Sequence, residues 1–352
     1  MRGWGASVAV VCTAALLAGC SAAVTHPGAA TAPTVTITDM SGREVTVPEA
    51  IHRVLALHPI PTTLLELLAP GQIVGVDSVL RRSLQPDDAR FSAQQMSSLR
   101  SLPVTGVYFR DFDSERVMRL HPDVVITMTG DRNVDREQQR TGIPFVAVSK
   151  TPTSSYEKTI RLIGQIVGQS ERADQMAALW AQTIASVQAR AAAVPASGRP
   201  LVMYTGKNGD LLGIPGTDTV FGSSITTAGG RYVGDELPTG QSATENNPVT
   251  LEQVISWNPA VIIAASTRAR TAIVTDPRWR AVKAVHDGRV YVPPRYAGLD
   301  GLQAVLGMVW TQGVLLGDDA DARSTLTQAM QRYYQLFYGH PLTAAQLDQL
   351  CD

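Results

Sequence analysis

The stretch Glu115-Arg-Val-Met-Arg-Leu-His-Pro-Asp-Val-Val-Ile126 recurs in altered form as Glu252-Gln-Val-Ile-Ser-Trp-Asn-Pro-Ala-Val-Ile-Ile263. Each copy occupies a comparable place in its own half of the chain, so the repeat predicts two lobes built to one plan. Three further pairs exchange one apolar residue for another. The identical pairs are Glu115/Glu252, Val117/Val254, Pro122/Pro259, Val124/Val261 and Ile126/Ile263.

Each copy of the repeat has the pattern of a short helix followed by a strand. Asp113 or Ser114 can cap the first helix, and Thr250 can cap the second. We expect each helix to end before Pro122 or Pro259, because proline disfavours helical geometry in the preceding residue. The apolar run after the proline then enters a sheet. This unit would serve any α/β fold, so the repeat alone identifies no function.

The remainder of the chain alternates short β-branched runs with helix-like stretches. Residues 35–48 alternate on both sides of a Met-Ser-Gly turn and predict a β-hairpin. The alternation predicts an α/β protein with two lobes, each a mostly parallel sheet in three αβα layers. The predicted strands are 53–57, 73–76, 123–128 and 144–148 in the first half, and 201–204, 260–264 and 289–292 in the second.

One long helix is predicted between the halves, at residues 171–194. Its apolar residues step mostly by three and four, so one face is buried. At 1.5 Å per residue it would extend roughly 35 Å, which is enough to run along both lobes and to limit their closure. The predicted organisation is an N-terminal lobe at 35–152, a helical connector at 153–195 and a C-terminal lobe at 196–352. A core helix of one large domain is the alternative.

The N-terminus predicts export. Residues 1–20 contain one arginine, an apolar run too short to span a membrane permanently, and the ending Leu17-Ala-Gly-Cys20. That ending resembles a bacterial lipobox, which implies that Cys20 becomes the lipidated first residue of the mature chain. Residues 21–34 would form a flexible tether. The expected location is the outer face of the cell membrane, towards the periplasm or cell exterior; an ordinary signal peptide is the alternative.

Composition limits the partners. With Cys12 in the signal peptide and Cys20 lipidated, Cys351 has no cysteine partner for a disulfide within the mature chain. Lys and Arg number 30 against 31 Asp and Glu, so nothing indicates a polyanion such as nucleic acid. We expect a monomer whose stability comes from packed cores.

Together with residues 36–48 and 53–57, the repeat resembles substrate-binding proteins of ABC importers, in the helix-hinged family that captures ferric siderophores, haem and cobalamin. The resemblance covers nearly all of the mature sequence; Phe337-Tyr-Gly339 matches a further family segment. It implies a lipid-anchored protein that delivers a metal chelate, a ferric siderophore first of all, to a permease dimer. One glutamate of each lobe docks on permease arginines in that family, and the matching residues are Glu115 and Glu252.

Ligands of open α/β sheets bind beyond the carboxyl ends of the strands, so the facing loops of two lobes would form the ligand cleft. Arginine and lysine among tyrosines suit an anionic, partly aromatic ligand such as a ferric catecholate or carboxylate chelate. Our first choices are Arg110, Tyr204 and Arg295. The full set of candidate ligand-binding residues is His58, Tyr108, Arg110, Arg132, Tyr204, Lys207, Arg268, Arg295 and Tyr296.

Other functions stay open at this point. Bare zinc or manganese needs several converging imidazole and carboxylate ligands, and only His58 is well placed, so no protein-bound metal and no cofactor is expected. Haem on Tyr204 or His58, cobalamin, or an oxyanion such as molybdate are alternative ligands. No hydrolase elbow, zinc-protease helix or phosphate loop is present, so we expect no enzyme. An exported lipoprotein enzyme and a surface scaffold are the competing classes.

Overall fold

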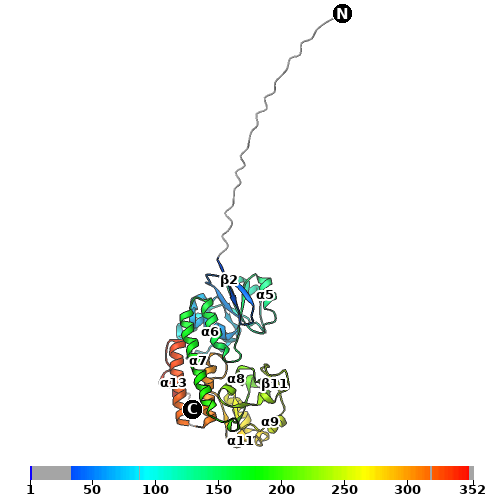
Figure 1. Cartoon of the computed structure of the whole chain (residues 1–352), viewed down its shortest axis with the longest axis vertical. Helices are drawn as coiled ribbons and strands as arrows, with labels where there is room; N and C mark the ends of the chain where they lie inside the picture. The colour runs from blue at the N-terminus through cyan, green and yellow to red at the C-terminus, as the bar shows by residue number, and fades with distance from the viewer. Residues whose placement is uncertain (2–32, 87, 318, 349–352) are drawn as a thin grey trace.

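The computed structural model describes Met1 and residues 33–86, 88–317 and 319–348. The chain forms two α/β lobes, stacked one above the other in Figure 1. The predicted lipidation site Cys20, most of the predicted tether, and Cys351 lie outside the described residues. Within the described part of the chain, no helix is long and apolar enough to cross a membrane.

The first lobe begins with the predicted hairpin, in which β1 (Thr34–Thr38) pairs antiparallel with β2 (Glu44–Pro48). Its main sheet is parallel, in the order β3-β6-β7. The expectation of a mostly parallel sheet is confirmed. The strands are β3 (Val54–Ala56), β6 (Val124–Met128) and β7 (Phe145–Val148), with a separate parallel pair of β4 (Val76–Asp77) and β5 (Val104–Thr105).

Both faces of this sheet are covered. Successive strand side chains point to opposite faces, and Val54 and Ala56 accordingly join the main apolar core while Leu55 joins a smaller one with Val117 of α4. The first lobe is therefore three-layered, as predicted. Its helices are α1 (Pro59–Leu68), α2 (Ser78–Ser83), α3 (Ala93–Ser101), α4 (Ser114–Arg119) and α5 (Val134–Thr141).

The second lobe repeats this topology. Its parallel sheet has the order β10-β8-β12-β13, so the repeat strand β12 lies between β8 and β13 as β6 lies between β3 and β7. The strands are β8 (Leu201–Thr205), β10 (Arg231–Tyr232), β12 (Val261–Ala264) and β13 (Val290–Tyr291), with an antiparallel pair of β9 (Gly213–Ile214) and β11 (Asn247–Pro248). The helices are α8 (Val220–Thr227), α9 (Leu251–Trp257), α10 (Thr267–Thr275) and α11 (Lys283–His286).

The two copies of the repeat also share their turn. Asp113 caps α4 and Thr250 caps α9, as expected. The residue before each proline is left-handed, with φ of 43° at His121 and 49° at Asn258. Asparagine is one of the few residue types that adopts this conformation readily, because its short side chain can hydrogen-bond locally. The repeat thus specifies a helix, a left-handed turn and a central strand.

The predicted connector helix is α7 (Ser170–Ala192), which follows α6 (Ser155–Ile166). Trp180 of α7 stacks on Tyr156 with ring centroids 4.5 Å apart and donates to the Thr153 carbonyl at 3.1 Å. Further along α7, the Val187 carbonyl accepts from Gln312 at 2.7 Å. Because α6 packs on α1 of the first lobe, α7 is joined to that lobe through α6 and to the second lobe through Gln312. Helix α13 runs beside α7 (Figure 1). The C-terminal helices are α12 (Ala304–Leu316), α13 (Asp319–Tyr338) and α14 (Ala344–Asp348).

Candidate ligand cleft between the lobes

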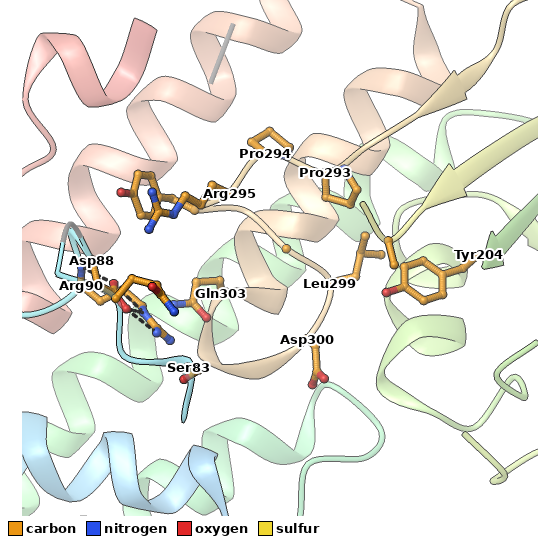
Figure 2. A pocket seen from close by; sticks show the side chains of 14 residues that line it. Ser83, Asp88, Arg90, Tyr204, Pro293, Pro294, Arg295, Leu299, Asp300 and Gln303 are labelled. Carbon is orange, nitrogen blue, oxygen red and sulfur yellow. Dashed lines mark hydrogen bonds and ion pairs between the residues drawn. The ribbon is translucent and has the colours of Figure 1, made fainter. Parts of the chain in front are cut away.

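A cavity of about 380 Å³ opens between the lobes (Figure 2). Ser83, Gln85, Asp88 and Arg90 of the first lobe contribute one wall, and Tyr204 with the loop at 293–303 contributes the other. The cavity is at the small end of ligand pockets, which commonly enclose roughly 300–1,000 Å³. Its lining is Ser83, Gln85, Asp88, Arg90, Tyr204, Ala265, Pro293, Pro294, Arg295, Tyr296, Gly298, Leu299, Asp300 and Gln303.

The first-lobe wall carries a neutralised charge pair. Arg90 Nη2 lies 2.6 Å from Asp88 Oδ2, and the Asp88 side chain is only 6% exposed. The Arg90 guanidinium is also 5.3 Å from the centre of the Phe91 ring. Figure 2 shows this pair opposite Tyr204, across the loop that carries Arg295. Because Arg90 already has a carboxylate partner, it contributes less attraction for a ligand anion than an unpaired cation would.

A second group of charges joins the two lobes. Glu245 Oε1 lies 2.5 Å from Lys150 Nζ, and Glu245 Oε2 lies 2.6 Å from Lys207 Nζ. Lys150 follows β7 in the first lobe, whereas Lys207 follows β8 in the second. The lysine side chains are 19% and 22% exposed, and that of Glu245 is 40% exposed. One carboxylate thus bridges two partly buried ammonium groups from opposite lobes.

These groups set one another's charge. Burial opposes ionisation of Glu245, but Lys150 and Lys207 outweigh it and lower its pKa to about 2. Burial also opposes the charge on Lys150, yet Asp300 and Glu245 raise its pKa above the ordinary value. His58 responds in the opposite direction, because burial and the charge of Lys150 lower its pKa to about 3. Near neutral pH Lys150 and Glu245 are therefore charged, and His58 is neutral.

Aromatic rings surround this centre. Tyr204 stacks on Phe221 with centroids 4.4 Å apart, and Lys207 Nζ lies 4.6 Å from the centre of the same Phe221 ring. Tyr108 tilts against His58 at 6.3 Å. Burial raises the pKa of both tyrosines, so their hydroxyls stay protonated and can donate hydrogen bonds. His58 itself caps α1, its Nδ1 accepting from the Ile60 amide at 3.3 Å.

A family model described as Periplasmic binding protein matches residues 54–297. The chain belongs to this family. This periplasmic binding protein is 26% identical over 333 residues to the molybdate-binding protein MolA of Haemophilus influenzae, covering 86% of this chain and 90% of MolA.

Solved structures share its fold. An ABC transporter solute-binding protein from Sulfurospirillum deleyianum superposes with a TM-score of 0.76 at 22% identity, covering 90% of this chain and 98% of that one. The triscatecholate siderophore-binding protein FeuA of Bacillus subtilis, complexed with ferri-bacillibactin, has a TM-score of 0.61 at 16% identity, covering 80% and 98%. These likenesses show that the chain shares their two-lobed fold.

The predicted ligand residues of this binding protein fall into two groups. Tyr204, Arg295 and Tyr296 line the cavity. His58, Tyr108 and Lys207 lie near the charged centre, where Lys150 and Glu245 influence them electrostatically or contact them.

The other three predicted ligand residues are elsewhere. Arg110 is exposed and shares with Glu115 a groove of about 480 Å³ on the first lobe. Arg132 and Arg268 are exposed and line neither this groove nor the cavity. Across the described residues, no group of three or more His, Cys, Asp or Glu is placed to hold a metal ion.

Sequence reasoning missed five charged residues between the lobes. They are Asp88, Arg90 and Asp300, which line the cavity, and Lys150 and Glu245 of the charged centre. Lys150 could have been found, since it follows the predicted strand 144–148 by two residues and lies at the carboxyl end of a parallel sheet. Glu245 had no such signal, because its loop follows no strand of recognisable pattern.

The two glutamates of the repeat are exposed at helix starts. Glu115 lies in the first turn of α4 with its side chain 76% exposed, 4.0 Å from Arg119. Glu252 lies in the first turn of α9 and is also exposed; hydrogen bonds from its own backbone and from Thr250 lower its pKa. Both carboxylates are therefore accessible, one on each lobe, and that of Glu252 is ionised at neutral pH.

Proposed function

We propose that this protein captures an anionic metal compound outside the cytoplasm and delivers it to the permease of an ABC importer. The observation that carries this proposal is the pair of partly buried lysines, Lys150 and Lys207, which point from opposite lobes to one carboxylate. Anionic oxygens accept strong charge-assisted hydrogen bonds from such donors. Two ammonium groups repel a bare metal cation, so a metal would enter as part of an anion.

A ferric siderophore is the first candidate ligand. Catecholate and carboxylate oxygens of such chelates carry the negative charge that the lysines complement, and Tyr108 and Tyr204 offer hydroxyl donors and ring surface. The fold is shared with FeuA, whose named ligand is a triscatecholate siderophore. The cavity of about 380 Å³ accommodates only part of a large chelate, so that part of the ligand would stay exposed at the mouth of the cleft.

Molybdate is the second candidate, favoured by the similarity to MolA across most of both chains. A tetrahedral oxyanion presents several oxygens to a pair of ammonium groups and needs no aromatic wall. Both candidates are anions that two cationic donors would bind. The lysine pair therefore supports anion binding without distinguishing between the two ligands.

Calorimetric titration of the purified protein tests this function. The probes are molybdate and a ferric tris-catecholate chelate, with haemin, cobalamin and free Zn²⁺ as contrasting ligands. We expect saturable one-to-one binding of one anionic probe and no conversion of it. Binding of cobalamin or Zn²⁺ alone would contradict the proposal.

We further propose that Cys20 anchors the protein by lipid and that Glu115 and Glu252 dock on permease arginines. Exposed ion pairs contribute only about 0–1 kcal/mol each, so two of them would orient the protein rather than hold it. Charge reversal replaces attraction by repulsion at both lobes. The Glu115→Lys, Glu252→Lys double variant is expected to lower uptake by about tenfold or more, with ligand affinity unchanged.

Uptake is measured in cells that carry the permease, and affinity by calorimetry. The matched control reverses Glu157 and Glu171, which also lie in the first turns of helices, and it should transport like the unchanged protein. Equal uptake by the two double variants would remove the docking role.

A further inference from the structure

We infer that Glu245 is an internal anion that occupies the ligand's place between Lys150 and Lys207, and that the ligand binds by displacing it. The inference rests on the proposed function and adds a specificity device to it. Each oxygen of Glu245 has a lysine of its own, at 2.5 and 2.6 Å. Two oxygens of an oxyanion, or of a chelate's carboxylate or catecholate group, can make the same pair of contacts.

The surroundings of Glu245 allow its side chain to leave while its backbone stays. The neighbouring Asn247 side chain donates to the carbonyls of Ile214, Gln241 and Thr244 at 3.0, 3.3 and 3.2 Å. The Thr244 carbonyl also accepts from the Gly216 amide at 2.8 Å. The loop is thus fixed on both sides of residue 245. Release of the two lysines therefore requires only rotation of the Glu245 side chain, which is 40% exposed and faces solvent on one side.

Displacement by an anion keeps both lysines paired, whereas displacement by a neutral ligand does not. Lys150 and Lys207 are about one-fifth exposed, so removing Glu245 without replacement takes from both ammonium groups the carboxylate that they contact, and only Lys150 keeps the more distant attraction of Asp300. A neutral compound would bear that cost, and an anionic one would not. Glu245 also connects the lobes in the absence of ligand, because Lys150 belongs to the first lobe and Glu245 to the second. Because displacement of Glu245 costs a neutral ligand more free energy than an anionic one, the internal carboxylate selects for ligands with negatively charged oxygens.

The test compares Glu245→Gln with Glu236→Gln and the unchanged protein. Glu236 is an exposed glutamate of the same lobe, so its substitution removes the same charge without touching the lysines. Affinity for molybdate and for a ferric tris-catecholate chelate is measured by calorimetry at fixed ionic strength. We expect Glu245→Gln to bind the anionic probe about tenfold more tightly, since the competing carboxylate is gone. Glu236→Gln should bind like the unchanged protein.

The outcomes separate this inference from the proposed function. Equal affinity of the unchanged protein and Glu245→Gln, or equal gains in both glutamine variants, would overturn the inference and leave the function standing. Weaker binding by Glu245→Gln would also overturn it, because Glu245 would then contact the ligand. Failure of all three proteins to bind either probe would overturn the function and the inference together.

Discussion

Replacement of Lys150 by glutamine is expected to weaken binding of the anionic ligand by roughly 10- to 100-fold. Hydrogen bonds to charged groups contribute about 1.5–3 kcal/mol each, and the partial burial of Lys150 places its ammonium in that range rather than in the weaker range of exposed pairs. Glutamine retains a hydrogen-bond donor of similar reach but loses the charge. The loss of affinity therefore reports the charge rather than the shape of the side chain.

The same change at Lys207 tests the second lobe. Lys207→Gln should weaken binding to a similar extent, and the double variant should bind more weakly than either. Lys158→Gln is the matched control, because Lys158 is an exposed lysine of α6 outside the cleft. Calorimetric titration measures the four variants and the unchanged protein. Unchanged affinity in the double variant would exclude the lysine pair as the ligand site.

The sequence predicted the architecture because the decisive signals are local. The predicted range of the long helix was 171–194, and α7 begins one residue before the start of that range and ends two residues before its end. The agreement is close because the buried face of the helix follows from the spacing of its apolar residues. The repeat predicted the positions of β6 and β12, because in each copy the apolar run follows a proline that ends a helix. The repeat did not reveal the left-handed backbone at His121 and Asn258. That conformation depends on the direction in which the chain turns from the helix into the strand.

The charged centre of the cleft could be predicted only in part. Strand ends locate Lys150 and Lys207, because the carboxyl ends of parallel strands meet at one edge. Glu245 reaches them from a loop, Asn247 fixes that loop by contacts far along the chain, and the pairing exists only once both lobes are folded. Arg110 shows the converse: it follows a first-lobe segment near the cleft, yet its side chain lies in the groove beside Glu115.

The largest effect on stability is expected from substitution of a buried glutamate in the first lobe. Glu66 of α1 is 2% exposed, and neither of its carboxylate oxygens has a hydrogen-bond partner of normal geometry among the described residues. Burial raises its pKa from 4.5 to about 7, and the nearby Gln95 side chain opposes this shift only in part. Glu66 makes no contribution to the ligand cavity or to the groove on the first lobe.

The direction of the pH effect follows from the raised pKa. Below pH 4.5 the Glu66 carboxyl is protonated in both the folded and the unfolded chain, and the stability it allows is fully present. As the pH rises from there, the unfolded chain ionises more readily than the folded one. The free energy of unfolding therefore falls with increasing pH through this window, and the loss is complete once the pH has passed the folded-state pKa of about 7.

Substitution Glu66→Gln removes this ionisation while keeping the shape of the side chain. At pH 8 the variant is expected to be more stable than the unchanged protein by roughly 1–3 kcal/mol, and at pH 4 the two should be nearly equal. Urea unfolding at pH 4, 6 and 8 measures the difference, with Glu49→Gln at an exposed site of the same lobe as control. A gain of the same size at all three pH values would show that packing, and not the buried charge, distinguishes the variant. A gain that is absent at pH 4, partial at pH 6 and largest at pH 8 assigns the effect to ionisation of Glu66, because a change in packing alone would not follow that titration.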